Sequence, residues 1–291
     1  MVVTYDASPK RAARLSLGQG GVLAIAALTA FAAVTPTRAA EAWPAKVDAR
    51  YTLKFNGIRV GHIAFASQAG SQTYSLESTG EISVLFGAIK WVGTSRVAGT
   101  VEKAGPAPNS YAFDWKKNKK GGSILLRFTD HKATQVSVEP PAGVGPEYVA
   151  LMDKHKAGVL DPLSAIMALT RADTSEPCDR RVPVFDGKQR FDVVFSPKRK
   201  TVIAPAKPGG VASVGFVCRA MYEPIAGHRN NADQKAYANN RDAEVVLQRL
   251  AGTAFLVPHS VTVPTAWGTG TMVIDTVAVT SAAAGRIVVA E

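Results

Sequence analysis

Few residues of this sequence have the types and spacing that catalysis requires. In the triplet Asp153-Lys154-His155 a carboxylate and an imidazole lie close enough to act as a general acid and a general base. Three consecutive polar residues ahead of a helix are more often a solvated loop. Ser95 and Ser164 have no base at a recognisable spacing, and the sequence has no Gly-x-Ser-x-Gly motif. The sequence therefore favours a protein without enzymatic activity, and it leaves open an enzyme whose active-site residues are dispersed.

The sequence also has no pattern typical of a metal or cofactor site. The histidines, at positions 62, 131, 155, 228 and 259, do not have the spacing of a zinc motif such as His-Glu-x-x-His. The Gly268-Thr269-Gly270 segment precedes an expected strand, whereas a phosphate-binding glycine loop precedes a helix. No cofactor is therefore expected.

Cys178 and Cys218 are the two cysteines of the chain. Their spacing is neither Cys-x-x-Cys nor that of a zinc site, which argues against a redox or metal role. In an oxidising compartment two such thiols form a disulfide wherever the geometry permits. We predict a Cys178–Cys218 disulfide, which would close a loop of about 40 residues and stabilise the fold by roughly 4 kcal/mol.

Two basic runs are the candidate contacts for an anionic partner. They are Lys116, Lys117, Lys119 and Lys120 in the first run, and Lys198, Arg199 and Lys200 in the second. Each run is expected at the tip of a β-hairpin, where charged residues also prevent sheet edges from pairing with other chains. The functional alternative is an electrostatic contact with the phosphates of lipid A or of phospholipid headgroups.

The first 39 residues have the features of a secretory signal peptide. Lys10, Arg11 and Arg14 form a basic segment, and small apolar residues follow without interruption from 20 to 34. This run is shorter than the roughly 20 residues that cross a membrane, so an uncleaved anchor helix is the weaker alternative. Small residues suit cleavage after Ala39, with Ala42 as the alternative.

Cleavage after Ala39 would leave residues 40–291 as a β-rich periplasmic domain. The whole chain has 34 Lys plus Arg against 23 Asp plus Glu, a net charge of +11. Residues 1–39 contain four of the basic residues and one of the acidic residues, so the mature charge is +8. Export would place this basic chain among anionic lipids and lipopolysaccharide, so lipid or envelope partners are expected and a nucleic-acid partner is not.

Alternating apolar residues predict mainly β-structure from residue 48 onward. Tyr51, Leu53 and Phe55 alternate with polar residues, and Asn56-Gly57 then predicts a hairpin because both central residues of a type I′ turn need a positive φ. The returning strand covers 58–66, with Ile63 and Phe65 on its core side. Asp186-Gly187 predicts a second hairpin.

Two short helices are expected between the strands. The segment 161–171 can begin with Asp161 as its cap and Pro162 as its first residue. Apolar residues at 82, 85, 86 and 89 have helical spacing and predict a helix within 81–90. The polar segment 227–242 has little periodicity and is expected to be a loop.

The fold class predicted is mainly β, an antiparallel, strongly curved sheet or open barrel-like meander of about a dozen strands around the helix at 161–171. Residues 46–139 and 161–280 could form two unequal halves. Several large aromatic residues could line an apolar cavity inside this sheet or fill its core, and a packed interior is slightly favoured. These residues are Trp43, Phe86, Trp91, Phe113, Trp115 and Trp267.

Over residues 46–280 the chain resembles the exported Gram-negative envelope proteins of the family named domain of unknown function 3108. The motifs are Tyr51-x-Leu53-x-Phe55-Asn-Gly-Ile58-x-Val60-Gly61, Asp161-Pro-Leu-Ser164-Ala-Ile, Val184-Phe185-Asp186-Gly187 followed by Arg190-Phe191-x-Val193, and Pro258-x-x-Val261 ahead of Thr269-Gly270. The resemblance implies a periplasmic β-rich fold and no established activity, so it assigns no catalytic residue. The family's likeness to open half-barrel lipoprotein carriers is an analogy of fold.

The sequence is compatible with two functions. The first is a non-enzymatic envelope scaffold or carrier that holds an apolar, lipid-like ligand inside the curved sheet. The alternative is a periplasmic hydrolase acting on lipid or cell wall. A carrier needs an apolar interior with few titratable groups, whereas an enzyme needs polar groups with perturbed pKa values converging in a cleft.

The signal peptide is testable by intact-mass spectrometry of the exported protein. We expect the mass of residues 40–291, because the small residues that precede Ala40 suit signal peptidase. A mass that still includes residues 1–39 would show an uncleaved anchor.

Overall fold

The computed structural model describes residues 43, 45–85, 87–171, 176–205, 212–250, 255–281 and 285–290. All of them belong to one compact unit, Ala40–Glu291. The predicted signal peptide, the cleavage sites after Ala39 and Ala42, and Phe86 lie outside the described residues.

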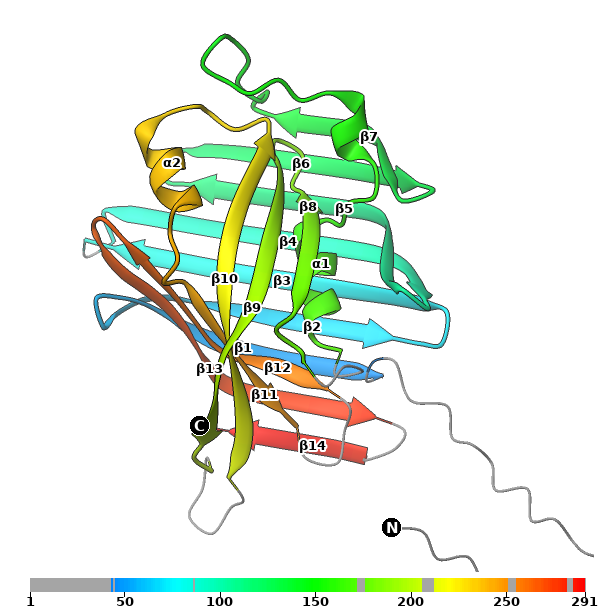
Figure 1. Ribbon diagram of the computed structural model, residues 1–291, viewed down its shortest axis with the longest axis vertical. Helices are drawn as coiled ribbons and strands as arrows, with labels where there is room; N and C mark the ends of the chain where they lie inside the picture. Colours follow the sequence, from blue (N-terminus) through cyan, green and yellow to red (C-terminus); the bar gives the residue numbers. More distant parts are fainter. Residues whose placement is uncertain are drawn as a thin grey trace, which may run out of the picture. The chain divides into compact units, whose positions relative to one another are not determined.

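Antiparallel β-strands make up most of the described chain (Figure 1). The strands are β1 (Lys46–Phe55), β2 (Ile58–Ala69), β3 (Thr73–Val84), β4 (Ile89–Glu102), β5 (Gly105–Lys117), β6 (Lys120–Thr129), β7 (Lys132–Glu139), β8 (Arg180–Phe185), β9 (Arg190–Ile203), β10 (Ser213–Ala226), β11 (Glu244–Arg249), β12 (Leu256–Thr265), β13 (Gly268–Ser281) and β14 (Gly285–Ala290). The helices are α1 (Pro162–Leu169), α2 (Ala232–Ala238) and one 3-10 turn, Asp153–Lys156.

The strands form one sheet in the order β7-β6-β5-β4-β3-β2-β1-β13-β12-β11-β10-β9-β8, and β14 pairs with β13. Since β1 pairs with β13, the predicted segments 46–139 and 161–280 share this sheet. The terminal strands β7 and β8 do not pair, so the sheet is not closed. The structure thus confirms the predicted antiparallel, curved, mainly β fold.

The sheet folds back over its own inner face. Figure 1 shows β8, β9 and β10 crossing in front of β3 to β6, with α1 between the two layers. Helix α1 contacts β3, β4 and β5 on one side and β8 on the other. The β8–β9 turn reaches β6, because a Cβ added to Gly187 would lie 2.5 Å from Cγ2 of Ile124. Packing therefore brings together the two ends of the sheet, whose terminal strands β7 and β8 do not pair with each other.

Both predicted hairpins are confirmed, with different turns. Asn56 and Gly57 both have positive φ, 48° and 81°, as a two-residue type I′ turn requires. The second turn is longer, because β9 begins only at Arg190. There Oδ1 of Asp186 accepts hydrogen bonds from the backbone amides of Lys188, at 2.8 Å, and Gln189, at 2.6 Å.

The predicted helix at 161–171 is confirmed as α1. Asp161 caps it, with Oδ1 accepting from the backbone N of Leu163 at 2.9 Å and of Ser164 at 3.1 Å. Its carboxyl end is also satisfied by side chains, since the Arg180 guanidinium donates to the carbonyl oxygens of Ala168 at 2.8 Å and Arg171 at 2.6 Å. Such partners are needed because a helix buried in a sheet has no water for its terminal groups.

The predicted helix within 81–90 is wrong. Strand β3 continues to Val84 and β4 begins at Ile89, and Ile82 pairs with Trp91 across the hairpin. The described residues of this helical spacing, Ile82, Leu85 and Ile89, lie on two strands and the turn between them. Pairing with neighbouring strands decided the conformation, as it commonly does for short segments.

The prediction of a loop throughout 227–242 is also wrong, because α2 lies within it. Asn231 caps this helix by accepting from the backbone N of Gln234 at 2.9 Å. None of the residues of α2 is buried, so the segment lacks the apolar period that reveals a helix in a sequence.

Three apolar clusters form the core, and α1 joins the two largest. Leu163 and Met167 belong to the cluster on the inner face of β3 to β6, and Ala165 belongs to the cluster on β8 to β11. The third cluster lies on β1, β12 and β13. The Cys178–Cys218 disulfide is confirmed, with 5.2 Å between the Cα atoms, and both cysteines are buried in the second cluster.

Replacing both Cys178 and Cys218 with Ala should lower the free energy of unfolding by about 2–4 kcal/mol, because the unfolded chain regains the freedom of a long loop. Urea unfolding followed by circular dichroism measures this loss. Wild-type protein unfolded in a thiol reductant should show a similar loss, and an unchanged midpoint in either sample would contradict the prediction.

Candidate functional site

A cavity of about 230 Å³ lies on the inner side of the sheet, beside the carboxyl-terminal half of α1. Packed protein interiors contain few voids larger than one water molecule, so this space is not ordinary packing. Its volume is somewhat below that of most small-ligand sites, about 300–1,000 Å³. Its lining residues are Trp43, Val47, Ala49, Tyr51, Phe65, Ser67, Ala69, Leu76, Ile166, Met167, Leu169, Thr170, Val245, Phe255, Leu256, Val257, Pro258, Val261, Met272 and Val279.

Among the residues that the structure describes, the lining of this cavity has no charged side chain. Its hydroxyl groups are those of Tyr51, Ser67 and Thr170, and the Thr170 hydroxyl already donates to the carbonyl oxygen of Met167 at 2.8 Å. Burial raises the pKa of Tyr51, so this phenol stays neutral. The cavity thus offers apolar contact and little to recognise a polar group.

Among the aromatic residues that the sequence suggested for a cavity, Trp43 lines this one. Trp91 packs against Phe113, with 6.3 Å between ring centroids. Trp267 is exposed, and Phe86 lies outside the described residues. The interior is hollow beside the carboxyl-terminal half of α1, so the expectation of a packed interior does not hold there.

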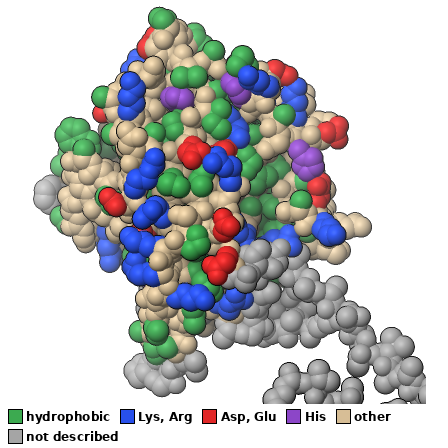
Figure 2. Space-filling view, in the orientation of Figure 1, with side chains coloured by type: hydrophobic (Ala, Val, Ile, Leu, Met, Phe, Trp, Pro, Cys, Tyr) green, Lys and Arg blue, Asp and Glu red, His purple; other side chains and the backbone are tan. Residues whose placement is uncertain are grey.

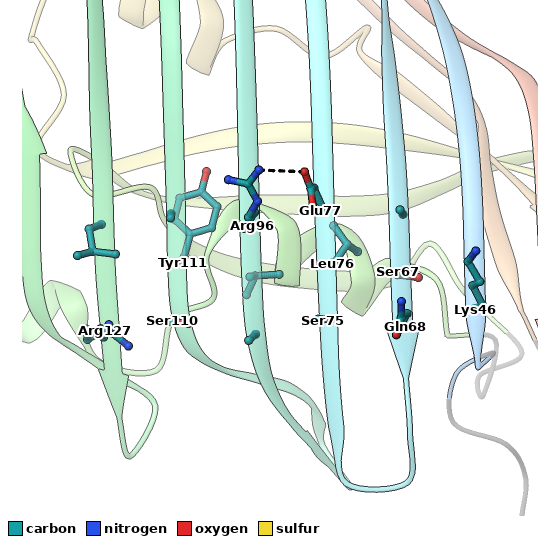
Figure 3. A pocket seen from close by; sticks show the side chains of 15 residues that line it. Lys46, Ser67, Gln68, Ser75, Leu76, Glu77, Arg96, Ser110, Tyr111 and Arg127 are labelled. Carbon is teal, nitrogen blue, oxygen red and sulfur yellow. Dashed lines mark hydrogen bonds and ion pairs between the residues drawn. The ribbon is translucent and has the colours of Figure 1, made fainter.

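A second hollow, of about 420 Å³, lies across the outer face of β1 to β6 (Figure 3). Small side chains such as Ser75, Ala98 and Ser110 line it, and an exposed ion pair between Arg96 Nη2 and Glu77 Oε1, 3.2 Å long, crosses it. In Figure 3 α1 lies behind these strands, so this groove and the inner cavity are on opposite faces of the sheet. A groove covered by no second layer excludes less water than the inner cavity does.

A buried polar cluster lies at the amino end of α1. The Ser164 hydroxyl donates to Oδ2 of Asp161, so its oxygen accepts from the Tyr74 hydroxyl, with 2.6 Å between the two oxygens. Burial raises the pKa of Asp161 to about 6. A serine beside a carboxylate resembles a catalytic pair, but both carboxylate oxygens are engaged in capping, and neither Asp161 nor Ser164 is exposed or lines the cavity. Sequence patterns had indicated no partner for Ser164, but its hydroxyl donates to Asp161, which precedes it by the three residues typical of a helix cap.

The triplet Asp153-Lys154-His155 forms a 3-10 turn on the surface. The Lys132 side chain donates to Asp153 and keeps its pKa below the ordinary value. Nδ1 of His155 accepts from the backbone N of Met152 at 3.1 Å, which closes the turn. In the described ranges, no three His, Cys, Asp or Glu side chains meet as a metal site requires.

The two basic runs occupy different surroundings. Lys116, Lys117, Lys119 and Lys120 surround the β5–β6 turn, as predicted, and are exposed. No ion pair involves these four lysines among the described residues.

The prediction of a hairpin tip is wrong for Lys198, Arg199 and Lys200, which lie within β9. Lys198 and Arg199 pair with Glu244, and Nζ of Lys200 lies 5.8 Å from the ring centroid of Phe216. Figure 2 shows basic and acidic side chains next to one another on this face. The cross-strand partner Glu244 follows the polar segment 227–242, so sequence spacing could not reveal it.

A family model described as a protein of unknown function, DUF3108, matches residues 50–275. The chain belongs to this DUF3108 family. The match confirms the resemblance that the hairpin and helix motifs predicted. No curated protein matches this DUF3108 chain.

The comparison with solved structures found one that is similar to this chain. It is a beta-barrel-like protein of domain of unknown function DUF1849 from Brucella abortus, with 10% sequence identity, 81% coverage of this chain, 98% coverage of that chain and a TM-score of 0.44. Among its described residues, the DUF3108 chain has no helix long and apolar enough to span a membrane.

The buried Asp161 of this DUF3108 protein should make stability depend on pH. Its pKa is raised from 3.8 to about 6, so the stabilisation relative to Asp161→Asn is full below pH 3.8 and is lost as the pH rises through 6. The difference in unfolding free energy between the two proteins should change by about 2–3 kcal/mol from pH 4 to pH 7. Urea titrations at several pH values measure it.

Asp48→Asn is the matched control, because the Asp48 side chain is about half exposed and its ion pair with Lys46 is on the surface. Its difference from wild type should vary little over this pH range. If the difference in unfolding free energy between wild type and Asp161→Asn did not change with pH, burial would not raise the pKa of Asp161 in the folded protein.

Proposed function

We propose that this DUF3108 protein holds a slender apolar molecule, such as one acyl chain of a lipid, in the cavity beside α1. The observation that carries the proposal is the lining of the cavity, which comes from a helix and a sheet and whose described residues include no charged side chain. An apolar chain would bury its surface there without leaving a polar group unpaired.

The position of the titratable groups supports a carrier over the alternative of a hydrolase. Burial raises the pKa of Asp161, as expected of an active-site acid, but this carboxylate is fully buried and its hydrogen bonds are to Leu163 and Ser164 in the first turn of α1. Asp186, whose pKa burial also raises, binds the backbone of its own turn. Neither carboxylate lines the cavity, so neither supplies an acid or a base to a molecule held there.

We further propose that the protein acts in the periplasm, as a carrier or scaffold of the cell envelope. Residues 1–39 have the pattern of a signal peptide, and the rest of the chain has a net charge of +8. The Cys178–Cys218 disulfide supports the same location, since structural disulfides persist in oxidising compartments.

Replacing Ala49 with Phe tests the cavity. Ala49 lies on β1 and lines the cavity, so a phenyl ring at this position would occupy the space of the ligand. We expect the affinity for the fluorescent fatty acid cis-parinaric acid to fall by about tenfold or more, as measured by fluorescence titration. The melting temperature is recorded in parallel, because overfilling a core commonly costs about 1–3 kcal/mol.

Ala98→Phe is the matched control, since it places the same ring in the groove on the outer face of the sheet. It should leave the affinity unchanged. Loss of binding in Ala98→Phe with retention in Ala49→Phe would assign the ligand to the outer groove, and absence of binding to the wild type would refute the proposal.

A further inference from the structure

Four turns lie side by side at one end of the sheet. The β1–β2 and β12–β13 turns are joined by the backbone N of Asn56, which donates to the carbonyl oxygen of Thr269 at 2.9 Å, and by the backbone N of Thr269, which donates to Oδ1 of Asn56 at 2.8 Å. The β3–β4 turn follows across the β2–β3 pair, where Gly61 pairs with Ile82. The first three turns are visible at the left of the sheet in Figure 1.

The β5–β6 turn is the fourth member of this row. Oδ1 of Asn118 accepts from the backbone N of Lys90 at 2.9 Å, which fixes this turn to the beginning of β4. The row therefore extends over neighbouring strands from β6 to β12, and we call it the turn end of the sheet.

Three of these turns present large apolar side chains to solvent. Trp267 is 81% exposed, Ile58 is 72% exposed and Leu85 is 69% exposed. Leu85 also has a φ of 53°, a conformation unfavourable for a bulky residue, so packing within the protein does not account for a leucine there. Tyr237 of α2 borders the same groove as Trp267 and is exposed as well.

Basic residues surround these apolar side chains. Within four positions of the four turns the sequence contains seven Lys or Arg residues and two carboxylates, Glu81 and Asp114. The basic residues are Lys54, Arg59, Lys90, Lys116, Lys117, Lys119 and Lys120. The adjoining α2 segment is balanced, with Asp233 and Asp242 against Lys235 and Arg241. The turn end thus has an excess of five positive charges around an apolar centre.

We propose that the turn end of the sheet docks this protein on an anionic phospholipid bilayer, with Ile58, Leu85 and Trp267 inserted at the level of the headgroups. Tryptophan is favoured at membrane interfaces, because its ring is apolar and its N–H is polar. Lysines around the inserted side chains match the negative potential of such a surface, and apolar insertion combined with basic charge is the usual composition of interfacial anchors. Nucleic acid would need no aliphatic side chains at the turn tips.

Docking would extend the proposed carrier function without depending on it. Tyr51 and Met272 line the cavity on β1 and β13, the strands that end at the turn end. A lipid-like ligand would therefore lie within the same strands that contact the bilayer. Sedimentation with lipid vesicles measures docking without any ligand in the cavity.

Sedimentation with lipid vesicles tests the proposal. Residues 40–291, which contain every described element and the disulfide, are mixed with vesicles of phosphatidylcholine alone or of phosphatidylcholine and phosphatidylglycerol, at low and high salt. We expect binding to the anionic vesicles and at least a tenfold weaker binding to the neutral ones, since headgroup charge provides the attraction. High salt should weaken the anionic binding.

The triple variant Ile58→Ser, Leu85→Ser, Trp267→Ser should bind the anionic vesicles at least tenfold less well than wild type. Because all three side chains are exposed, its melting temperature should stay near that of wild type. The matched control is Val202→Ser with Val214→Ser, which removes the same kind of exposed side chain, 75% and 48% exposed, from β9 and β10. This control should bind as wild type does.

Charge variants separate the two basic runs. Replacing Lys116, Lys117, Lys119 and Lys120 with Gln should weaken anionic binding and its dependence on salt. Replacing Lys198, Arg199 and Lys200 with Gln should have little effect, because Glu244 already pairs with two of them.

Insertion has its own readout in tryptophan fluorescence. Anionic vesicles should shift the emission of wild type to shorter wavelength, and Trp267→Phe should remove most of this shift.

Four results would overturn the proposal. They are absence of wild-type binding, wild-type binding by the triple variant, an equal loss in the Val202 and Val214 control, and dissociation of a dimer in the triple variant. The last result would assign the apolar side chains to contact with a second copy of the chain.

Discussion

The buried cap of α1 is the constraint on which the rest of the structure depends. A helix that enters the concave side of a sheet brings unpaired amides into a region without water, where each unpaired group is costly. Asp161 accepts from two of these amides, and Ser164 and Tyr74 extend the hydrogen bonds to β3. The sheet can fold back over α1 because this cluster provides hydrogen-bond partners for the polar groups at the amino end of the helix.

The other end of α1 is held by side chains from outside the helix. Arg180 donates to carbonyl oxygens at this end, and Nε1 of Trp43 donates to the carbonyl oxygen of Met167 at 3.3 Å. Arg171 lies over the Trp43 ring, 5.2 Å from its centroid. A helix of this length spans only about 12 Å, whereas the surrounding strands extend roughly 40 Å, so one short helix cannot fill the interior. The cavity lies beside its carboxyl-terminal half, where the filling is incomplete.

The same curvature explains why the two sides of the sheet have different chemistry. Apolar residues such as Tyr51, Leu76 and Val97 point into the core, while the outer face carries the ion pair of Glu77 and Arg96. At the turn end this alternation stops, because turns have no inner face to bury. Ile58, Leu85 and Trp267 are exposed there for that reason. In the described part of the chain, no carboxylate forms an ion pair with the nearby lysines of the β5–β6 turn.

The sequence by itself determined the features that rest on local chemistry. These are the period of the strands, the Asn56-Gly57 turn, the cap and extent of α1, and the pairing of two lone cysteines. Sequence patterns failed where neighbours in space decide. Ile82 and Ile89 had helical spacing but pair across a hairpin, and α2 forms at a cap without any apolar period.

Only the tertiary structure decided the candidate site. Nothing in the sequence marks the residues of α1, β1 and β12 as sharing one cavity, because their contact follows from the folding back of a long sheet. It also decided which basic run has a carboxylate partner, since Glu244 reaches Lys198 and Arg199 only through the pairing of β10 with β9 and β11. Local propensity acts over a few residues, whereas enclosure and charge pairing depend on strands far apart in the chain.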